Sequence, residues 1–153
     1  MKQEEKSSNK IERKFGLGVL VLIFDKNLSK ILLLKRNEEK RKKYHADWGY
    51  VGGKVELGEK LADACIREVR EETNLHLNPN DLKLIDIKES PFSTEIHHAI
   101  WFVYSIKING KEKITLNDES EEYGWFDIEK LPGRMVDSLE EAKKLIKKVK
   151  EMK

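Results

Sequence analysis

The segment Phe15–Phe24 restricts the fold more than any other part of the chain, because it is apolar along nearly its whole length. Its sequence is FGLGVLVLIF, and a second apolar run, KILLL, occupies residues 30–34. The turn-like sequence Asp25-Lys26-Asn27 separates the two runs, so together they predict a hairpin. A continuous apolar run of this length is typical of a well-buried strand, and we place it at the start of a sheet.

The remaining patterns predict further strands and two helices. Apolar residues recur at helical spacing from residue 59 to 73 and again from about 138 to 152. Strands are expected at residues 82–88, 95–108, 114–116 and 123–126, with Asn109-Gly110 as a turn. The polar and basic stretch at residues 37–50 is expected to be a loop followed by a short strand. This order of elements predicts an α/β fold in which a mixed sheet lies between helices.

Length and composition favour one soluble domain. The chain has 153 residues, which suits a single domain at 15–153 after a charged tail at 1–14. Its net charge is only +2, which argues against wholesale nucleic-acid binding. The single cysteine, Cys65, allows neither an intramolecular disulfide nor a cysteine-rich metal cluster. No signal-peptide core or membrane-spanning run is evident, so we expect a cytoplasmic protein without a membrane partner.

The predicted helix at 59–73 concentrates acids on one side. At roughly 100° per residue, Glu68, Glu71 and Glu72 fall within about one third of its circumference. Glu68 and Glu72 are four residues apart and repel each other unless something compensates. An oxygen-rich group of this kind suits a hard divalent cation such as magnesium. Taken alone, however, it also fits the solvated face of an ordinary amphipathic helix.

The glycines before this helix favour the metal interpretation. Gly52 and Gly53 permit a close approach of the backbone, as a site built partly from main-chain atoms requires. The whole segment resembles the Nudix box, G-x5-E-x7-R-E-U-x-E-E-x-G-U, in which U is a bulky aliphatic residue. The matching positions are Gly53, Glu59, Arg67, Glu68, Val69, Glu71, Glu72 and Leu75. Asn74 replaces the last glycine, and asparagine is the next-best residue for a left-handed helix end.

This resemblance implies a fold, a reaction and a set of roles. The fold is an α/β/α sandwich, and the reaction is metal-dependent hydrolysis of a nucleoside diphosphate linked to another group. Magnesium is the expected cofactor, with manganese as the alternative. The metal ligands would be Glu68, Glu71, Glu72 and the carbonyl of Gly52. Glu68 would also be catalytic, Arg67 would orient the acids, and Gly53 and Glu59 would be structural.

Other candidates lie outside the box. A second acid accepts the proton in some members of the family, and the acidic stretch Asp118–Glu122 offers Glu119 for this role; a solvated loop is the alternative. The substrate candidates are Arg36, at the end of a predicted strand, and Trp48 and Tyr50, which could stack on a base. Core packing is the competing interpretation of both aromatic residues. Phe92 is a further stacking candidate.

Several functions remain open at this point. The substrate could be a nucleotide sugar, ADP-ribose, a dinucleoside polyphosphate or a nucleoside triphosphate. A nucleotide-sensing module is the alternative from another class, although such a module is expected to have lost acids from the box. An RNA 5′-end pyrophosphohydrolase would use the basic residues 41–43. The lysine-rich final helix could also contact a membrane surface, but its apolar stripe fits ordinary docking. A homodimer is left open.

Overall fold

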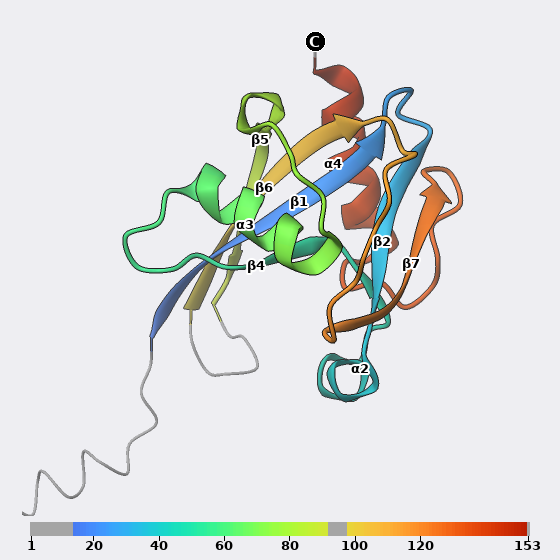
Figure 1. The fold of residues 1–153 in the computed structure, drawn as a ribbon. Helices are drawn as coiled ribbons and strands as arrows, with labels where there is room; N and C mark the ends of the chain where they lie inside the picture. The colour runs from blue at the N-terminus through green and yellow to red at the C-terminus, as the bar shows by residue number, and fades with distance from the viewer. Residues whose placement is uncertain (1–13, 92–97, 153) are drawn as a thin grey trace, which may run out of the picture.

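A sheet of seven strands forms the middle layer of residues 14–91 and 98–152, which are the residues described by the computed structural model (Figure 1). Its strands are β1 (Phe15–Asp25), β2 (Lys30–Arg36), β3 (Trp48–Gly49), β4 (Val51–Lys54), β5 (Lys83–Ser90), β6 (His98–Ile108) and β7 (Ser120–Asp127). The helices are α2 (Glu38–Tyr44), α3 (Leu61–Thr73) and α4 (Leu139–Glu151), and a short 3-10 helix η1 covers Pro79–Asp81. The predicted tail lies almost entirely outside the described residues, as do Phe92 and the first residues of the predicted strand 95–108.

β1 is the central strand, and it explains why the sheet is mixed. It runs parallel to β6 from Phe15↔His98 to Asp25↔Ile108, and antiparallel to β4 and β2. β1 and β2 share a single register pair, Phe24↔Ile31, beyond which β4 pairs with β1 while β3 and β7 pair with β2. The predicted hairpin therefore exists, but its two strands separate soon after the turn.

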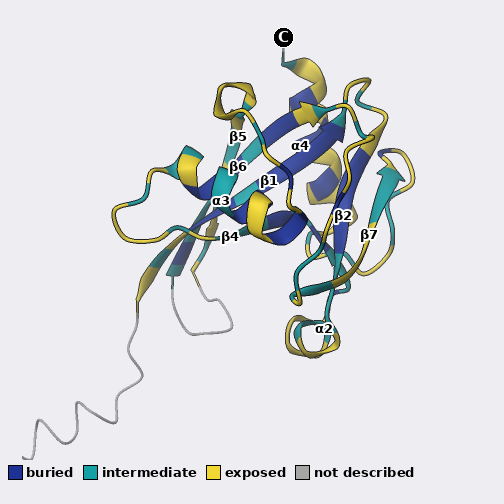
Figure 2. Cartoon of the chain, viewed as in Figure 1, coloured by how far each residue is buried: buried dark blue, intermediate teal, exposed yellow. Residues whose placement is uncertain are grey.

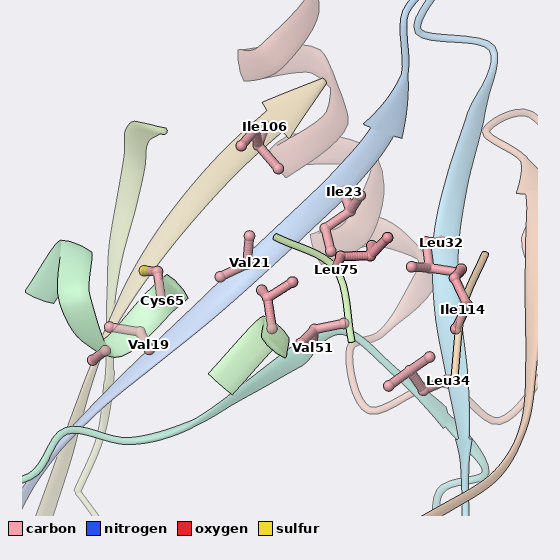
Figure 3. Packing of buried hydrophobic residues seen from close by; sticks show 12 residues of the cluster. Val19, Val21, Ile23, Leu32, Leu34, Val51, Cys65, Leu75, Ile106 and Ile114 are labelled. Atoms are coloured by element: carbon pink, nitrogen blue, oxygen red, sulfur yellow. The ribbon is translucent and has the colours of Figure 1, made fainter. Parts of the chain in front are cut away.

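The alternation of β1 residues builds a core on each side of the sheet. Val19, Val21 and Ile23 pack with Cys65 and Val69 of α3 (Figure 3). Leu22 and Phe24 face the opposite way and pack with α4, through the buried Leu145, Ile146 and Val149. Figure 2 shows both buried layers in dark blue around β1. Helices on both faces of a mixed sheet confirm the predicted α/β/α sandwich.

The stretch expected to be a loop contains helix α2, so that prediction was wrong. Asn37 caps the helix, because its side chain accepts a hydrogen bond from the Lys40 N–H. Two glutamates lie in its first turn and three basic residues in its last, which complements the helix dipole. None of its residues is buried, so it has no apolar periodicity by which it could be recognised.

Other predicted boundaries also change. Residues 114–116 do not form a strand, although Ile114 is buried and the Thr115 N–H donates to the Thr73 carbonyl. The acidic stretch is not entirely a loop, since β7 begins at Ser120. Helix α3 begins at Leu61 rather than at residue 59. The first residue of α4, Leu139, is 54% exposed and does not belong to the buried apolar stripe of that helix.

The end of α3 follows the prediction, because Asn74 adopts the left-handed conformation with φ of 62°. Among the described residues, no helix has both the length and the apolar character needed to cross a bilayer.

Candidate active site

The glycine pair lies on β4, where it allows two close approaches. Gly52 and Gly53 pair with Leu20 and Val19 of β1. A Cβ added at Gly52 would lie 2.2 Å from the carbonyl oxygen of Val19. A Cβ added at Gly53 would lie 2.5 Å from the Cδ atom of Glu68. The first glycine thus keeps the sheet intact, and the second leaves the space that the Glu68 carboxyl group fills.

Helix α3 brings the acids of the box to this glycine pair. Glu68 and Glu72 are one turn apart and both are buried, with exposures of 9% and 7%. The side chain of Glu71 is 54% exposed. The apolar residues Ala64, Cys65 and Val69 anchor the same helix on the sheet. Core packing thus fixes the position and rotation of the helix, and with them the positions of its acids.

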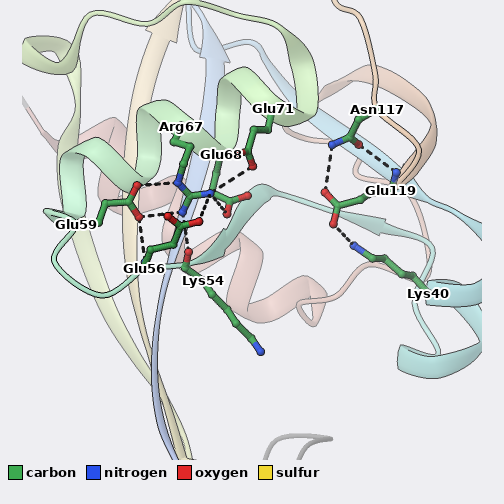
Figure 4. Close-up of polar contacts among 9 residues, drawn as sticks. All are labelled: Lys40, Lys54, Glu56, Glu59, Arg67, Glu68, Glu71, Asn117 and Glu119. Carbon is green, nitrogen blue, oxygen red and sulfur yellow. Dashed lines mark hydrogen bonds and ion pairs between the residues drawn. The ribbon is translucent and has the colours of Figure 1, made fainter.

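Arg67 joins the helix, the preceding loop and the acids (Figure 4). Its Nε and Nη2 atoms donate to the two carboxylate oxygens of Glu59 at 2.7 and 2.9 Å. Its Nη1 atom donates to Glu68 at 2.8 Å and to Glu71 at 3.3 Å, and Nη2 also reaches the Lys54 carbonyl at 2.9 Å. These bonds raise the pKa of Arg67 further and hold the pKa of Glu59 at about 2. One guanidinium group therefore fixes the loop, the helix and two of the acids relative to each other.

Glu72 is the least satisfied group in the site. Its Oε2 atom is buried and has no hydrogen-bond partner. No other buried side-chain nitrogen or oxygen atom of the described residues lacks a partner. Burial raises the pKa of Glu72 well above its usual range, and a hydrogen bond and the charge of Glu68 raise it further. An orphaned carboxylate oxygen beside a second carboxylate is costly to keep in a folded protein.

A hard divalent cation fits the chemistry of this carboxylate pair. It prefers carboxylate oxygens and would balance two adjacent negative charges. Within residues 14–91 and 98–152, no three acidic, histidine or cysteine side chains are arranged so that they could hold a metal ion together. Glu71 instead turns to Arg67, so the third acid of the expected set is held by an ion pair.

Glu119 lies in the turn just before β7. Its Oε1 atom accepts a hydrogen bond from Lys40 Nζ at 2.9 Å, and its Oε2 atom accepts one from Asn117 Nδ2 at 3.3 Å. The bond to Lys40 lowers the pKa of Glu119, so this carboxyl group is charged at neutral pH. The charge of Glu119 is also among those that raise the pKa of Glu72. The fold thus brings Glu119 within electrostatic range of Glu72.

Arg36 lies at the end of β2, also within electrostatic range of Glu72. Its guanidinium group packs over the ring of Tyr44 at 5.0 Å and rests beside Gly49, where an added Cβ would lie 3.5 Å from Nε. Burial lowers its pKa. In the described part of the chain no carboxylate forms an ion pair with its guanidinium group.

Trp48 and Tyr50 face the α4 side of the sheet, away from α3. Trp48 packs edge-on against Phe126 with ring centroids 4.8 Å apart, and both predicted stacking residues contact the core beneath α4. The Tyr50 hydroxyl donates to Asp137 at 2.9 Å, and burial raises its pKa. The structure therefore does not bring these two aromatic residues together with the acids.

Sequence reasoning missed two residues at the site, Asn37 and Lys40. Asn37 caps α2 and Lys40 lies on it, and both contact the turn that carries Glu119. An asparagine followed by two glutamates and then by basic residues is a recognisable helix start, and this was the signal available.

Comparison with known protein families finds a match over most of the chain. A family model described as the NUDIX domain matches residues 14–148. The chain belongs to the Nudix family. This confirms the family expected from the box.

Two curated Nudix relatives illustrate the range of similarity. An ADP-ribose pyrophosphatase of Methanocaldococcus jannaschii is 34% identical over 104 residues, which cover 68% of this chain and 58% of that protein. Nucleoside triphosphatase NudI of Salmonella schwarzengrund is 30% identical over 105 residues, covering 65% of this chain and 74% of the relative. The chain thus spans less than two thirds of the first of these relatives.

Solved structures support the Nudix fold. The crystal structure of a MutT NUDIX hydrolase from Burkholderia pseudomallei has a TM-score of 0.71 with 24% identity, covering 90% of this chain and 99% of that one. The MutT protein from Methanosarcina mazei Go1 gives 0.69 with 24% identity, and the match covers 94% of this chain and the whole of the other. At this level of identity the comparison establishes the fold.

Proposed function

We propose that this Nudix protein is a divalent-cation-dependent pyrophosphohydrolase that cleaves a phosphoanhydride bond in a nucleoside diphosphate linked to another group. The observation that carries the proposal is the buried pair Glu68 and Glu72, one oxygen of which has no partner. A pair of this kind has little value for stability alone, because removing water from two acids costs free energy. It has value if a cation and a polyphosphate complete it.

The residues that would hold the cation are Glu68, Glu71 and Glu72, together with the carbonyl of Gly52. Magnesium is our first choice and manganese the second, because both prefer oxygen ligands. When bound, such an ion neutralises phosphate oxygens and makes water more acidic. Glu71 would have to exchange its contact with Arg67 for this role, and Arg67 would still be held by its two bonds to Glu59.

Two residues outside the box complete the proposed chemistry. Glu119 is ionised and lies in electrostatic range of Glu72, so it is suited to accept the proton of the attacking water. Arg36 offers a guanidinium group without a carboxylate partner in the described structure, and it is suited to bind a phosphate oxygen of the substrate. Arg36 stands on a strand, and hydrogen bonds from Lys40 and Asn117 hold Glu119 in its turn, which favours fixed geometry during turnover.

The candidate substrates follow from the relatives. One of them is named an ADP-ribose pyrophosphatase and another a nucleoside triphosphatase. We therefore place ADP-ribose and nucleoside triphosphates first among the compounds to be tested, followed by nucleotide sugars and dinucleoside polyphosphates. Capped and triphosphorylated RNA belong in the same panel, because a further relative, from Danio rerio and 33% identical, is named an mRNA hydrolase. The net charge of the chain is only +2, and Arg41 and Lys42 already form ion pairs with glutamates of the chain. Both facts favour small nucleotides over RNA as substrates.

The test is turnover of this panel with magnesium, with manganese and with a chelator. We expect release of phosphate or a nucleotide from at least one compound, only with a metal present. Glu72→Gln should reduce turnover by about 100-fold or more, since it removes a charge and keeps the shape. Glu140→Gln on α4 is a matched control, because that side chain is 81% exposed and far from the box in sequence.

Two outcomes would contradict the proposal. Comparable turnover by Glu71→Gln, Glu72→Gln and the wild type would remove the metal role. Binding of several nucleotides without any turnover would make the chain a nucleotide-sensing module.

A further inference from the structure

Helix α2 is joined to the turn that carries Glu119 through the backbone. The Asn37 N–H donates to the Glu119 carbonyl at 3.0 Å, and Asn37 Nδ2 donates to the Asp118 carbonyl at 3.0 Å. The Oδ1 atom of the same side chain accepts from the Lys40 N–H at 2.9 Å, which begins the helix. One asparagine therefore caps α2 and holds the Asp118–Glu119 turn against it.

Lys40 extends this link to the Glu119 carboxylate. Its Nζ atom and the Asn117 side chain each bond a different oxygen of that group, as Figure 4 shows. A carboxylate with a separate donor on each oxygen cannot rotate without losing a hydrogen bond. Lys40 and Glu119 are 37% and 45% exposed, so both remain in contact with solvent.

Helix α2 has little other purpose in the fold. It has no buried residue, so it adds little to the apolar core. Its Arg41 pairs with Glu121 at the start of β7 and also donates to the Arg36 carbonyl. The contacts of Asn37, Lys40 and Arg41 thus converge on the same stretch of chain, residues 118–121, and on the end of β2.

We propose that Asn37 and Lys40 are positioning residues that use α2 to hold the Glu119 carboxylate in place for proton transfer. The effect on catalysis rests on the proposed hydrolysis, whereas the immobilisation of Glu119 rests on the hydrogen bonds described above. Neither residue touches the reacting atoms. Both act through Glu119, so their removal should matter only while Glu119 is present.

The test compares Lys40→Met with Lys42→Met on the same helix. Lys42 forms an exposed pair with Glu38 and points to no site residue in the described structure, so the control removes a charge from α2 without touching Glu119. For the substrate with the fastest turnover, we expect Lys40→Met to lower kcat about tenfold with little change in KM. Lys40→Arg should recover most of the loss, and Lys42→Met should match the wild type.

A double variant separates positioning from a general effect. In the Glu119→Gln background, adding Lys40→Met should change kcat less than about twofold, because the group it positions has gone. Full additivity of the two changes would overturn the proposal, as would a Lys40→Met enzyme with normal kcat.

Hydrogen exchange gives a readout that does not depend on activity. Amides of residues 117–122 should exchange several-fold faster in Lys40→Met than in Lys42→Met. Equal exchange in the two variants overturns the positioning role even in a chain that hydrolyses its substrate. If the wild type hydrolyses none of the compounds but the two variants differ in exchange, the proposed function fails and the structural link between α2 and Glu119 stands.

Discussion

Gly53→Ala tests whether the glycine before the helix is needed for space. The added Cβ would lie 2.5 Å from Glu68 Cδ and Oε1 and 2.6 Å from Oε2, whereas ordinary contacts begin at 3.4 Å. The Glu68 carboxyl group must therefore retreat by about 1 Å. Because the obstacle is the end of a flexible side chain, β4 can keep its pairing with β1.

The expected cost is larger for activity than for stability. Overpacking of this kind costs about 1–3 kcal/mol of folding free energy. The displaced carboxyl group also loses its 2.8 Å bond from Arg67. A misplacement of about 1 Å in a catalytic group costs on the order of 100-fold in rate, which corresponds to about 2.7 kcal/mol in the activation barrier. The variant should therefore fold and be almost inactive.

The assay measures kcat/KM and thermal unfolding of three glycine variants. Gly133→Ala is the control, because a Cβ there meets nothing within 4 Å, and it should match the wild type. Gly52→Ala meets the Val19 carbonyl at 2.2 Å and should unfold at clearly lower temperature than Gly53→Ala. The reasoning is refuted if Gly53→Ala keeps kcat/KM within about twofold of the wild type.

Four further predictions follow from local contacts. Glu59→Gln should make the free energy of unfolding depend less on pH in the acid range. The pKa of Glu59 is about 2 in the fold and 4.5 ordinarily, so its ionised carboxylate stabilises the fold fully above about pH 4.5. That stabilisation is lost as the pH falls toward 2. Urea midpoints measured across that window should show the change, and an unchanged slope would contradict it. Asn74→Ala should cost about 1 kcal/mol in urea unfolding and Asn74→Gly nothing, since φ is 62°; equal effects would argue against strain. Ser138→Ala should cost about 1 kcal/mol, because its hydroxyl accepts from the Glu141 N–H at 3.1 Å, and Ser138→Asp should recover that loss in the same measurement. Cys65 is buried and its pKa is raised to about 12, so a thiol reagent should label it only as the chain unfolds; rapid labelling of the native protein would contradict this.

The fold was predictable where packing leaves a pattern in the sequence. The apolar run at β1 and the helical spacing in α3 and α4 reflect burial on known faces, so the order of layers followed from them. Helix α2 left no such pattern, because it has no buried residue. Residues 114–116 carried a strand-like sequence, yet no neighbouring strand pairs with them in the described structure.

The same distinction applies to the site. The spacing of acids within one helix placed Glu68 and Glu72 together, since helical geometry is local. The bond between Lys40 and Glu119 joins residues 79 positions apart, and it depends on how two turns meet at the end of β2. No local pattern encodes such a meeting. The turn of Glu71 toward Arg67 is likewise a competition between partners that the sequence alone does not rank.

The parallel pairing of β1 with β6 has a consequence for how the chain is made. The first apolar strand is made before its longest ladder can form, because that ladder needs residues 98–108, roughly 80 residues later. Until β6 leaves the ribosome, one edge of the nascent β1 lacks its partner and its buried side chains are exposed to other chains. We expect the domain to fold only after β6 has been synthesised, and to depend on chaperones when it is made quickly.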